Sequence, residues 1–551
     1  MCPVPQKTKT DTKRCFPFLR FRLFLLPRQA EKAILNLYKN CIKRSVAMKK
    51  YDLIVIGTGA ANIVTDAALR QGLSIAIIER GRFGGTCLNR GCIPTKILVT
   101  AANYIREIRE ARRLGVMTDN VRFDWAAVTA RLRTKIDRES RLVKEYYGSM
   151  DAVDLYEGTA VFTGMRTLRI DLNDGGQEVI SADKMVIGTG AKTNVPDLPG
   201  LEEAGYITSE SLFGSGYPQQ PYQSLIIVGG GPIGCEFAHV FDAAGTKVTL
   251  IQHNVRLLPK EDEAVSAHLL KQFMDYGITV RLNQNTLSVR KEKERKVLTF
   301  RNRTTGEEGE VAAEEILIAP GIMPTIDLLQ PAISGIAVDK RGYILTNEFL
   351  ETSADRIWAL GDINGLAPFR HKANHEAEVI AHNIFSDTPP EAWRWARYDV
   401  VPAVTYTYPE AAHIGLTEVQ AEKAGLPVTT AMNHYSASAK GYALGYTPDE
   451  ADDGFVKLVI NKETSEILGV HIIGHEASLL IQPFINLLSC GHQTLTVVHE
   501  EIASPTAAML RARGLTRELD PKSVLTVGET ITPHPSLSEV TMWTRYYYEG
   551  K

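Results

Sequence analysis

Residues 51–62 read Tyr-Asp-Leu-Ile-Val-Ile-Gly-Thr-Gly-Ala-Ala-Asn, an apolar run that leads into two glycines, Gly57 and Gly59. The apolar run predicts a β-strand buried on both faces, and a helical pattern follows the glycines to about residue 70. Glycines at such a turn let the backbone approach a pyrophosphate at the N-terminus of a helix. The stretch therefore predicts the first strand, turn and helix of a dinucleotide-binding fold.

A second apolar run, residues 74–78, ends at Glu79, about twenty residues after the glycines. A carboxylate at this place accepts a hydrogen bond from a ribose hydroxyl. Asn62 replaces the third glycine of the usual pattern. Because strand, turn, helix, strand and acid occur in register, the stretch is much more specific than two glycines alone.

The same pattern occurs again further along the chain. An apolar strand at residues 224–228 precedes a complete set of glycines, Gly229, Gly231 and Gly234, and a further strand is expected at residues 247–251. Two such modules in one chain predict two nucleotide cofactors, and therefore two electron carriers.

The second module has no acid at its end, where Gln252 is followed by His253 and, four residues after Gln252, by Arg256. A carboxylate at this position would repel a 2′-phosphate, and a cation would attract it. The sequence therefore favours NADPH over NADH, against the alternative that this is only a basic surface turn.

Residues 84–96 read Gly-Gly-Thr-Cys-Leu-Asn-Arg-Gly-Cys-Ile-Pro-Thr-Lys and place Cys87 and Cys92 five residues apart. Two buried structural thiols would also explain the spacing. The position after a nucleotide-binding turn favours a redox disulfide, because the nucleotide supplies its electron partner. If Cys92 begins a helix, the positive end of that helix stabilises its thiolate.

Composition narrows the class of protein. The chain has 551 residues, 44% hydrophobic and 23% charged, with a net charge of -2, so we expect a globular enzyme with no nucleic-acid partner. Seven scattered cysteines argue against a secreted disulfide scaffold and for a reducing, cytoplasmic compartment. Residues 1–47 form a basic extension, which leaves an organellar transit peptide as the alternative. Its apolar run at residues 16–26 contains two arginines, so we expect no membrane span.

The expected fold class is α/β, with two Rossmann-like dinucleotide-binding domains and a C-terminal α+β interface domain. The predicted boundaries are 1–47 for a disordered basic extension, 48–195 and 320–395 for the two parts of an FAD-binding domain, 196–319 for an NAD(P)-binding domain, and 396–551 for the interface domain. A long apolar helix is expected at residues 477–489 of that last domain.

Two further stretches carry candidate groups. A strand delivers Asp362 to a loop, where its carboxylate is placed to hold the sugar chain of a cofactor. Near the end of the chain His534 lies between two prolines, and Glu539 follows five residues later. A histidine with a carboxylate nearby suits a general acid-base. A helix capping box is the alternative explanation for Glu539. The pair His371 and His375 has metal-ligand spacing but no third ligand, so no metal site is predicted there or at the other histidine pairs.

These motifs, taken in order, resemble those of the flavin-dependent pyridine nucleotide-disulfide oxidoreductases. The resemblance runs from residue 48 to the C-terminus. It implies FAD on the first module, NAD(P)H on the second, a small dithiol or disulfide substrate, and an obligate homodimer. In that dimer the loop carrying His534 reaches the disulfide of the other subunit.

The resemblance also assigns roles to individual residues. It makes Cys92 the thiol beside the flavin and Cys87 the thiol that exchanges with substrate. It makes His534 the proton carrier, oriented by Glu539. Lys96 pairs with Glu236 beside the flavin, Glu79 holds the adenosine ribose, and Asp362 holds the ribityl chain. The other expected cofactor-binding residues are Gly57, Gly59, Gly85, Thr86, Ala160, Thr189, Gly190, Gly229, Gly231, Gly234, Gln252, His253 and Gly321.

The substrate stays open at this point. Within the family the chain resembles dihydrolipoamide dehydrogenase-like proteins most, with mycothione reductase-like disulfide reduction as the alternative. Pro232 stands where glutathione reductases place a gating tyrosine, which weakens that assignment. Electron transfer to quinones or metals, with the disulfide as a bystander, is a further alternative, and a non-catalytic subunit is a third.

Overall fold

The computed structural model describes residues 48–214, 216–385, 389–448, 452–463, 466–490, 494–496, 504–518 and 531–534. The chain divides into two compact units, residues 1–50 and residues 51–551. The basic extension at residues 1–47 and Glu539 lie outside the described residues. Among the helices in the described ranges, none has both the length and the apolar character needed to cross a bilayer.

The first sheet has the strand order β1-β2-β3-β4-β5-β15, with β1 also paired to β5. Strand β1 pairs in parallel with β2 in the register Leu53↔Ile75, and the residues of β1 from Leu53 to Ile56 are at most 4% exposed. The prediction of a strand buried on both faces is confirmed. The strands are β1 (Lys49–Ile56), β2 (Ile75–Glu79), β3 (Val153–Gly164), β4 (Thr167–Leu172), β5 (Gln177–Ile187) and β15 (Ile357–Ala359).

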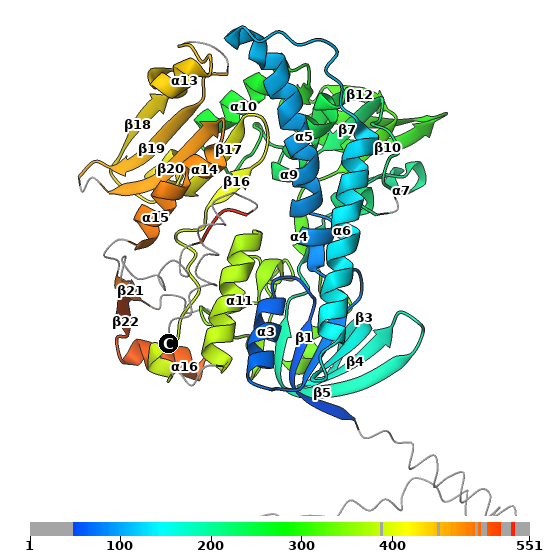
Figure 1. Cartoon of the computed structure of the whole chain (residues 1–551), viewed down its shortest axis with the longest axis vertical. Coiled ribbons are helices and arrows are strands. Elements are labelled where there is room, and N and C mark those ends of the chain that lie inside the picture. Colours follow the sequence, from blue (N-terminus) through cyan, green and yellow to red (C-terminus); the bar gives the residue numbers. More distant parts are fainter. Residues whose placement is uncertain are drawn as a thin grey trace, which may run out of the picture. The chain divides into compact units, whose positions relative to one another are not determined.

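Helices cover the first sheet because each presents an apolar stripe to it. Val64 on α3 (Asn62–Arg70) and Ala377 on α11 (Arg370–Phe385) share one core with Leu53 and Ile75 of the sheet. Phe162 and its neighbours form a separate core on the other face. Hydrophobic cores therefore pack on both faces of this sheet, and α3 and α11 lie side by side next to β1 (Figure 1).

The second sheet is parallel, with the order β13-β7-β8-β9. Its strands are β7 (Ser224–Val228), β8 (Lys247–Ile251), β9 (Thr279–Arg281) and β13 (Glu315–Ile318), and its helices are α9 (Pro232–Ala243) and α10 (Glu263–Asp275). An antiparallel sheet accompanies it, formed by β10 (Gln284–Glu292), β11 (Arg295–Asn302) and β12 (Glu308–Ala313). The second strand-turn-helix predicted from the glycines is confirmed.

Two long helices link the sheets. Helix α5 (Cys92–Glu110) lies against α9, and α6 (Trp125–Gly148) lies beside α5, as Figure 1 shows. Trp125 at the start of α6 stacks on Phe241 of α9 with ring centroids 5.5 Å apart. Both rings belong to the largest hydrophobic core, which therefore joins α5 and α6 to the second sheet.

The C-terminal sheet is antiparallel, with the order β16-β17-β20-β19-β18. Its strands are β16 (Ala403–Thr405), β17 (Glu410–Gly415), β18 (Val428–His434), β19 (Phe455–Asn461) and β20 (Ile467–Gly474). The prediction of one helix over residues 477–489 is wrong, because α14 (Ala477–Leu480) ends and α15 begins at Gln482 and runs to Cys490. Pro483 lacks the amide hydrogen that would continue the ladder.

Candidate active site

The cysteine motif folds as a short helix, a bend and a long helix. Helix α4 (Gly85–Asn89) carries Cys87, and α5 begins at Cys92, which confirms the predicted place of that residue at a helix start. Gly84 takes φ +102°, a conformation that favours glycine, immediately before α4. The side chain of Asn89 donates to the carbonyl oxygens of Phe83 at 2.9 Å and Gly85 at 3.0 Å and closes the turn.

His534 lies beside the first cysteine. Its Nε2 is 3.2 Å from Sγ of Cys87, although 447 positions separate the two residues. The backbone amide of His534 donates to Nδ1 of His371 at 3.3 Å, and Nε2 of His371 donates to the carbonyl oxygen of Pro402 at 2.8 Å. Burial lowers the pKa of His371 to about 3, so this ring is neutral and can accept at Nδ1.

The resemblance implies that the histidine approaches the disulfide of the other subunit. Within the single chain of this structure, His534 lies beside Cys87, and His371 of α11 accepts from its backbone amide. The contact between subunits stays a prediction.

Cys87 and Cys92 are in the dithiol form in this structure, and both are partly buried. The hydrogen bond from Cys92 to Cys87 and burial raise the pKa of Cys92 well above its usual value, whereas His534 lowers it. The expected stabilisation of the Cys92 thiolate is therefore wrong for the dithiol form. The positive end of α5 is present, but the neighbouring sulfur and the loss of solvent outweigh it.

Lys96 and Glu236 form the predicted pair. Nζ of Lys96 donates to both carboxylate oxygens of Glu236, at 2.7 and 2.6 Å, and so joins α5 to α9. The backbone amide of Tyr406 also donates to Glu236, at 3.0 Å, and Nζ lies 4.4 Å from the centre of the Tyr406 ring. A partly buried, bidentate ion pair of this kind positions helices more firmly than an exposed pair does.

A cavity of about 510 Å³ runs from the first glycine turn to the two cysteines. Oε2 of Glu79 accepts from the amide and hydroxyl of Thr58, at 3.1 and 2.7 Å, so the acid lies against the glycine turn. A Cβ at Gly57, which has φ +98°, would overlap the backbone oxygen of Gly188. The predicted residues that line this cavity are Gly57, Gly59, Glu79, Gly85, Thr86, Cys87, Cys92, Ala160, Thr189, Gly190 and Asp362.

The residues of this cavity fit FAD. Its wall offers a side-chain-free glycine turn at one end and a carboxyl group, Asp362, further along, which suit a pyrophosphate and a polyol chain. The hydroxyl of Thr189 is buried in this wall and has no hydrogen-bond partner among the described residues. Lys96 is not among the lining residues and contacts Glu236 instead.

Sequence reasoning missed the support beneath Asp362. The turn Gly361–Asn364 is held by Lys372 and Glu376, two wholly buried residues on α11. Nζ of Lys372 donates to the carbonyl of Gly361 at 3.0 Å and to Glu376 at 3.1 Å. Burial raises the pKa of Asp362. The i,i+4 spacing of lysine and glutamate was visible in the sequence, but such pairs are usually on the surface.

The second glycine turn is built like the first. A Cβ at Gly229 would overlap the backbone oxygen of Ala319, so β7 and β13 approach closely there. Gln252 is buried against this turn: it accepts from the amide of Gly230 at 3.1 Å and donates to the carbonyl of Arg256 at 3.1 Å. His253, the next residue, is exposed, and Gly321 follows β13 with open space around its Cα.

The two rings of the histidine pair on α11 contact the protein backbone. Both nitrogens of His371 are used by the backbone, as described above, and His375 accepts from the amide of Arg397 at 3.4 Å. Two histidines of the C-terminal sheet, His413 and His471, approach Glu261.

The chain matches known proteins over most of its length. Residues 51–381 match the family model described as pyridine nucleotide-disulphide oxidoreductase, and residues 401–513 match the dimerisation domain of the same family. Mycothione reductase of Mycobacterium tuberculosis is 33% identical over 81% of this chain and 94% of that protein. Dihydrolipoyl dehydrogenase of Chlorobaculum parvum is 35% identical over 78% of this chain and 89% of that protein.

A comparison with solved structures also finds a flavoprotein disulfide reductase. The Cu(II) complex of the HOCl-induced flavoprotein disulfide reductase RclA from Escherichia coli has a TM-score of 0.69 and 25% identity. The match covers 91% of this chain and 100% of that chain. With two nucleotide-binding sheets, a cysteine pair in the cavity and matches over most of its length, this chain belongs to the pyridine nucleotide-disulphide oxidoreductases, enzymes that use FAD and NAD(P)H and act on sulfur groups.

Proposed function

We propose that this enzyme passes electrons between NADPH and a small dithiol or disulfide through Cys87 and Cys92, with a dihydrolipoamide-like substrate. The observation that carries the proposal is the 3.2 Å separation of Cys87 Sγ from Nε2 of His534, beside a cavity that fits FAD. A thiol that exchanges with a disulfide needs a nearby acid-base and access from solvent, and Cys87 is only partly buried.

The roles of the residues follow from chemistry. Bound FAD would accept a hydride from the nicotinamide and supply two electrons to the cysteine pair. The thiolate of Cys87 attacks one sulfur of the substrate disulfide, and His534 gives a proton to the sulfur that leaves. Cys92 then attacks Cys87 in the mixed disulfide, which releases the second substrate thiol and restores the Cys87–Cys92 disulfide. Dihydrolipoamide oxidation is the reverse sequence.

For the cofactor, Gly57, Gly59 and Glu79 would hold the adenosine and pyrophosphate part of FAD, and Asp362 the polyol chain. Support comes from their common cavity and from the lack of room for a Cβ at Gly57. Lys96 would act by holding α5 against α9 through Glu236 rather than by lining the cavity.

The test compares Cys87→Ser with the unchanged enzyme. Lipoamide turnover should fall to background, whereas NADPH-dependent quinone reduction should persist. In the unchanged enzyme, mass spectrometry after NADPH reduction should find alkylation at Cys87 and, more slowly, at Cys92, but not at Cys235, a buried thiol that serves as internal control. Lipoamide turnover that survives in Cys87→Ser would show that the disulfide is a bystander.

We also propose a homodimer, supported by the match of residues 401–513 to a dimerisation domain. Coexpression of Cys87→Ser with His534→Ala then asks which subunit supplies the histidine. If His534 serves its own chain, as the 3.2 Å contact supports, mixed dimers stay as inactive as either variant. If His534 serves the other subunit, each mixed dimer contains one complete site and activity returns.

NADPH is the proposed nucleotide because no acid follows β8. Gln252 offers an amide there, and Arg303 donates to the carbonyl of His253 at 3.3 Å, so a guanidinium group lies beside this turn. Gln252→Glu should lower the ratio of kcat/KM for NADPH to that for NADH by about tenfold or more, since it places two negative charges together. Gln252→Met, the control, adds no charge and should change both values alike. An unchanged ratio in Gln252→Glu would contradict the assignment.

Mycothione-like disulfide reduction is the alternative substrate class, and a panel of lipoamide, mycothione-like and glutathione disulfides separates the two. Reduction of Cu(II) is a second candidate. Ligand atoms of Cys87, Cys92 and His534 lie within 4.8 Å of one another, and the similar Escherichia coli reductase was solved as a Cu(II) complex. NADPH-dependent formation of Cu(I), followed with a Cu(I)-specific chelator, should disappear in Cys87→Ser if the thiols bind the metal.

A further inference from the structure

Three side chains from separate segments meet on one face of the C-terminal sheet, over its inner strands β17 and β20. His413 on β17 and His471 on β20 are paired directly across the strands, with ring centroids 5.7 Å apart and planes at 26°. Glu261, just before α10, accepts a hydrogen bond from Nδ1 of His413 at Oε2, at 2.7 Å. One possible ligand atom from each residue lies within 4.8 Å of the others. We call this group the His-His-Glu cluster.

The state of His471 is fixed by its surroundings. Its Nε2 donates to the carbonyl oxygen of Leu416 at 3.0 Å, so the neutral ring carries its lone pair on Nδ1. That nitrogen is buried and has no hydrogen-bond partner among the described residues. Histidines that bind metals usually donate their other ring N–H to a backbone carbonyl or a carboxylate, which orients the free nitrogen. His471 has this arrangement, and an unpaired buried acceptor is unfavourable without a ligand.

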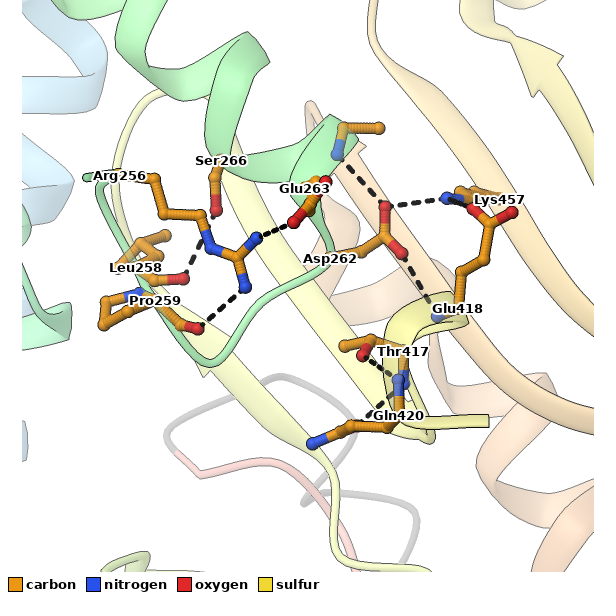
Figure 2. Close-up of polar contacts among 11 residues, drawn as sticks. Arg256, Leu258, Pro259, Asp262, Glu263, Ser266, Thr417, Glu418, Gln420 and Lys457 are labelled. Atoms are coloured by element: carbon orange, nitrogen blue, oxygen red, sulfur yellow. Dashed lines mark hydrogen bonds and ion pairs between the residues drawn. The ribbon is translucent and has the colours of Figure 1, made fainter. Parts of the chain in front are cut away.

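The local charge also suits a cation. The side chain of Glu261 is 6% exposed, and Asp262, next to it, shares Lys457 with Glu418, at 2.9 and 2.6 Å (Figure 2). Two carboxylates therefore share Lys457, a third, that of Glu261, pairs with His413, and Lys260 adds a second cation near His413.

We propose that the His-His-Glu cluster binds a divalent transition-metal ion of the Zn²⁺ class, through one oxygen of Glu261, one nitrogen of His413 and Nδ1 of His471. Two imidazoles and a carboxylate are a ligand set that suits Zn²⁺, with water at the fourth position. Atoms that bind one ion at about 2.0–2.2 Å lie closer to one another than 4.8 Å, the distance within which the three ligand atoms now lie. The side chains therefore rotate slightly toward one another when the ion binds. The ion displaces the proton that His413 now donates to Glu261.

The position of the His-His-Glu cluster determines how an ion reaches it and what its binding does to the fold. His413 is 17% exposed, which opens a route from solvent, whereas the other two ligands are buried. Glu261 lies in the segment between β8 and α10 of the second nucleotide-binding sheet, and the histidines lie in the C-terminal sheet. A bound ion would therefore join the segment before α10 to the C-terminal sheet, and its binding should raise the temperature of unfolding.

The experiment uses untagged, full-length, FAD-loaded protein in which Cys87→Ser and Cys92→Ser remove the second candidate metal group found among the described residues. The protein is stripped with chelator, loaded with Zn²⁺ and desalted, and its metal content and melting temperature are measured. We expect about one Zn²⁺ per chain and a higher melting temperature. In the same background His471→Gln should weaken Zn²⁺ binding at least about tenfold and abolish the thermal shift.

A matched control separates the cluster from histidines in general. His434→Gln changes an exposed histidine on β18 of the same sheet and should leave Zn²⁺ content and thermal shift unchanged. If His471→Gln does not fold, His413→Gln tests the same loss at the more exposed ligand. Absence of stoichiometric Zn²⁺ in the double cysteine variant, or full retention of Zn²⁺ in the His413 or His471 variant, overturns the proposal.

Discussion

Glu376→Gln tests how the cofactor cavity is supported. The Glu376 carboxylate accepts four hydrogen bonds within the buried interior: from the amide of Gly361 at 2.6 Å, the ammonium of Lys372 at 3.1 Å, the amide group of Asn364 at 2.7 Å and the hydroxyl of Tyr398 at 2.7 Å. Glutamine has the same shape but replaces one acceptor oxygen with an NH₂ group. Whichever oxygen is replaced, two of the four donors then face an NH₂ group instead of an acceptor.

The expected loss of stability in Glu376→Gln follows from the burial of the ion pair between Lys372 and Glu376. Lys372 and Glu376 are both 0% exposed, and Lys372 keeps only neutral oxygens of Gly361 and Asn364 once the carboxylate is gone. Removal of one partner from a buried ion pair costs about 3–5 kcal/mol. Since a folded domain is stable by only about 5–15 kcal/mol, we expect a large drop in stability. The same turn carries Asp362, so FAD retention should fall with it.

The assay is urea unfolding of the FAD-loaded protein, followed by tryptophan and flavin fluorescence, with the midpoint of the first transition compared between variants. Glu422→Gln, at an exposed position of α12 (Glu418–Lys423), is the control and should change the midpoint little. A Glu376→Gln midpoint equal to that of the control would refute the argument.

Three further outcomes are expected. The pKa of His371 is lowered to about 3, so between about pH 6.5 and pH 3 the unfolded chain binds a proton that the folded chain does not. The free energy of unfolding should therefore fall by up to about 1.4 kcal/mol for each unit by which the pH is lowered in this range. His371→Gln should flatten that slope in denaturant titrations. Gly57→Ala should release FAD on gel filtration because its Cβ would overlap Gly188, whereas Gly72→Ala, at another positive φ with open space, should retain it. In the reduced enzyme Cys92 should react slowly with iodoacetamide at pH 7 and faster above pH 9, because its pKa is raised.

The local parts of the fold could be predicted from the sequence. The strand before Gly57 and the start of α5 at Cys92 depend on neighbouring residues, on apolar runs and on turns that require glycine. The break before α15 was missed because the apolar pattern continues through Pro483, and only the missing amide at that residue ends the helix ladder.

The contacts between distant segments could not be predicted from the residues alone. His534 was assigned to the cysteine pair only through the family resemblance, since 447 positions lie between it and Cys87. His371 was considered only as half of a metal pair, and its role as acceptor for the His534 backbone needs the fold. The prediction that the Cys92 thiolate is stabilised was wrong in direction. The helix terminus is a local feature that the sequence shows, whereas burial and the neighbouring sulfur, which raise the pKa of Cys92, depend on packing.

Helix α5 shows how the two nucleotide-binding modules are linked to the thiols. Lys96 lies four residues after Cys92, on the same face of the helix, and its ion pair with Glu236 fixes this first turn against α9. Further along, Arg106 pairs with Asp242 at the other end of α9. Because α9 starts at the second glycine turn, a displacement of α9 on nucleotide binding moves the same helix that carries Cys92. We therefore expect the nucleotide site and the disulfide to be coupled through two side-chain pairs rather than through the cofactor alone.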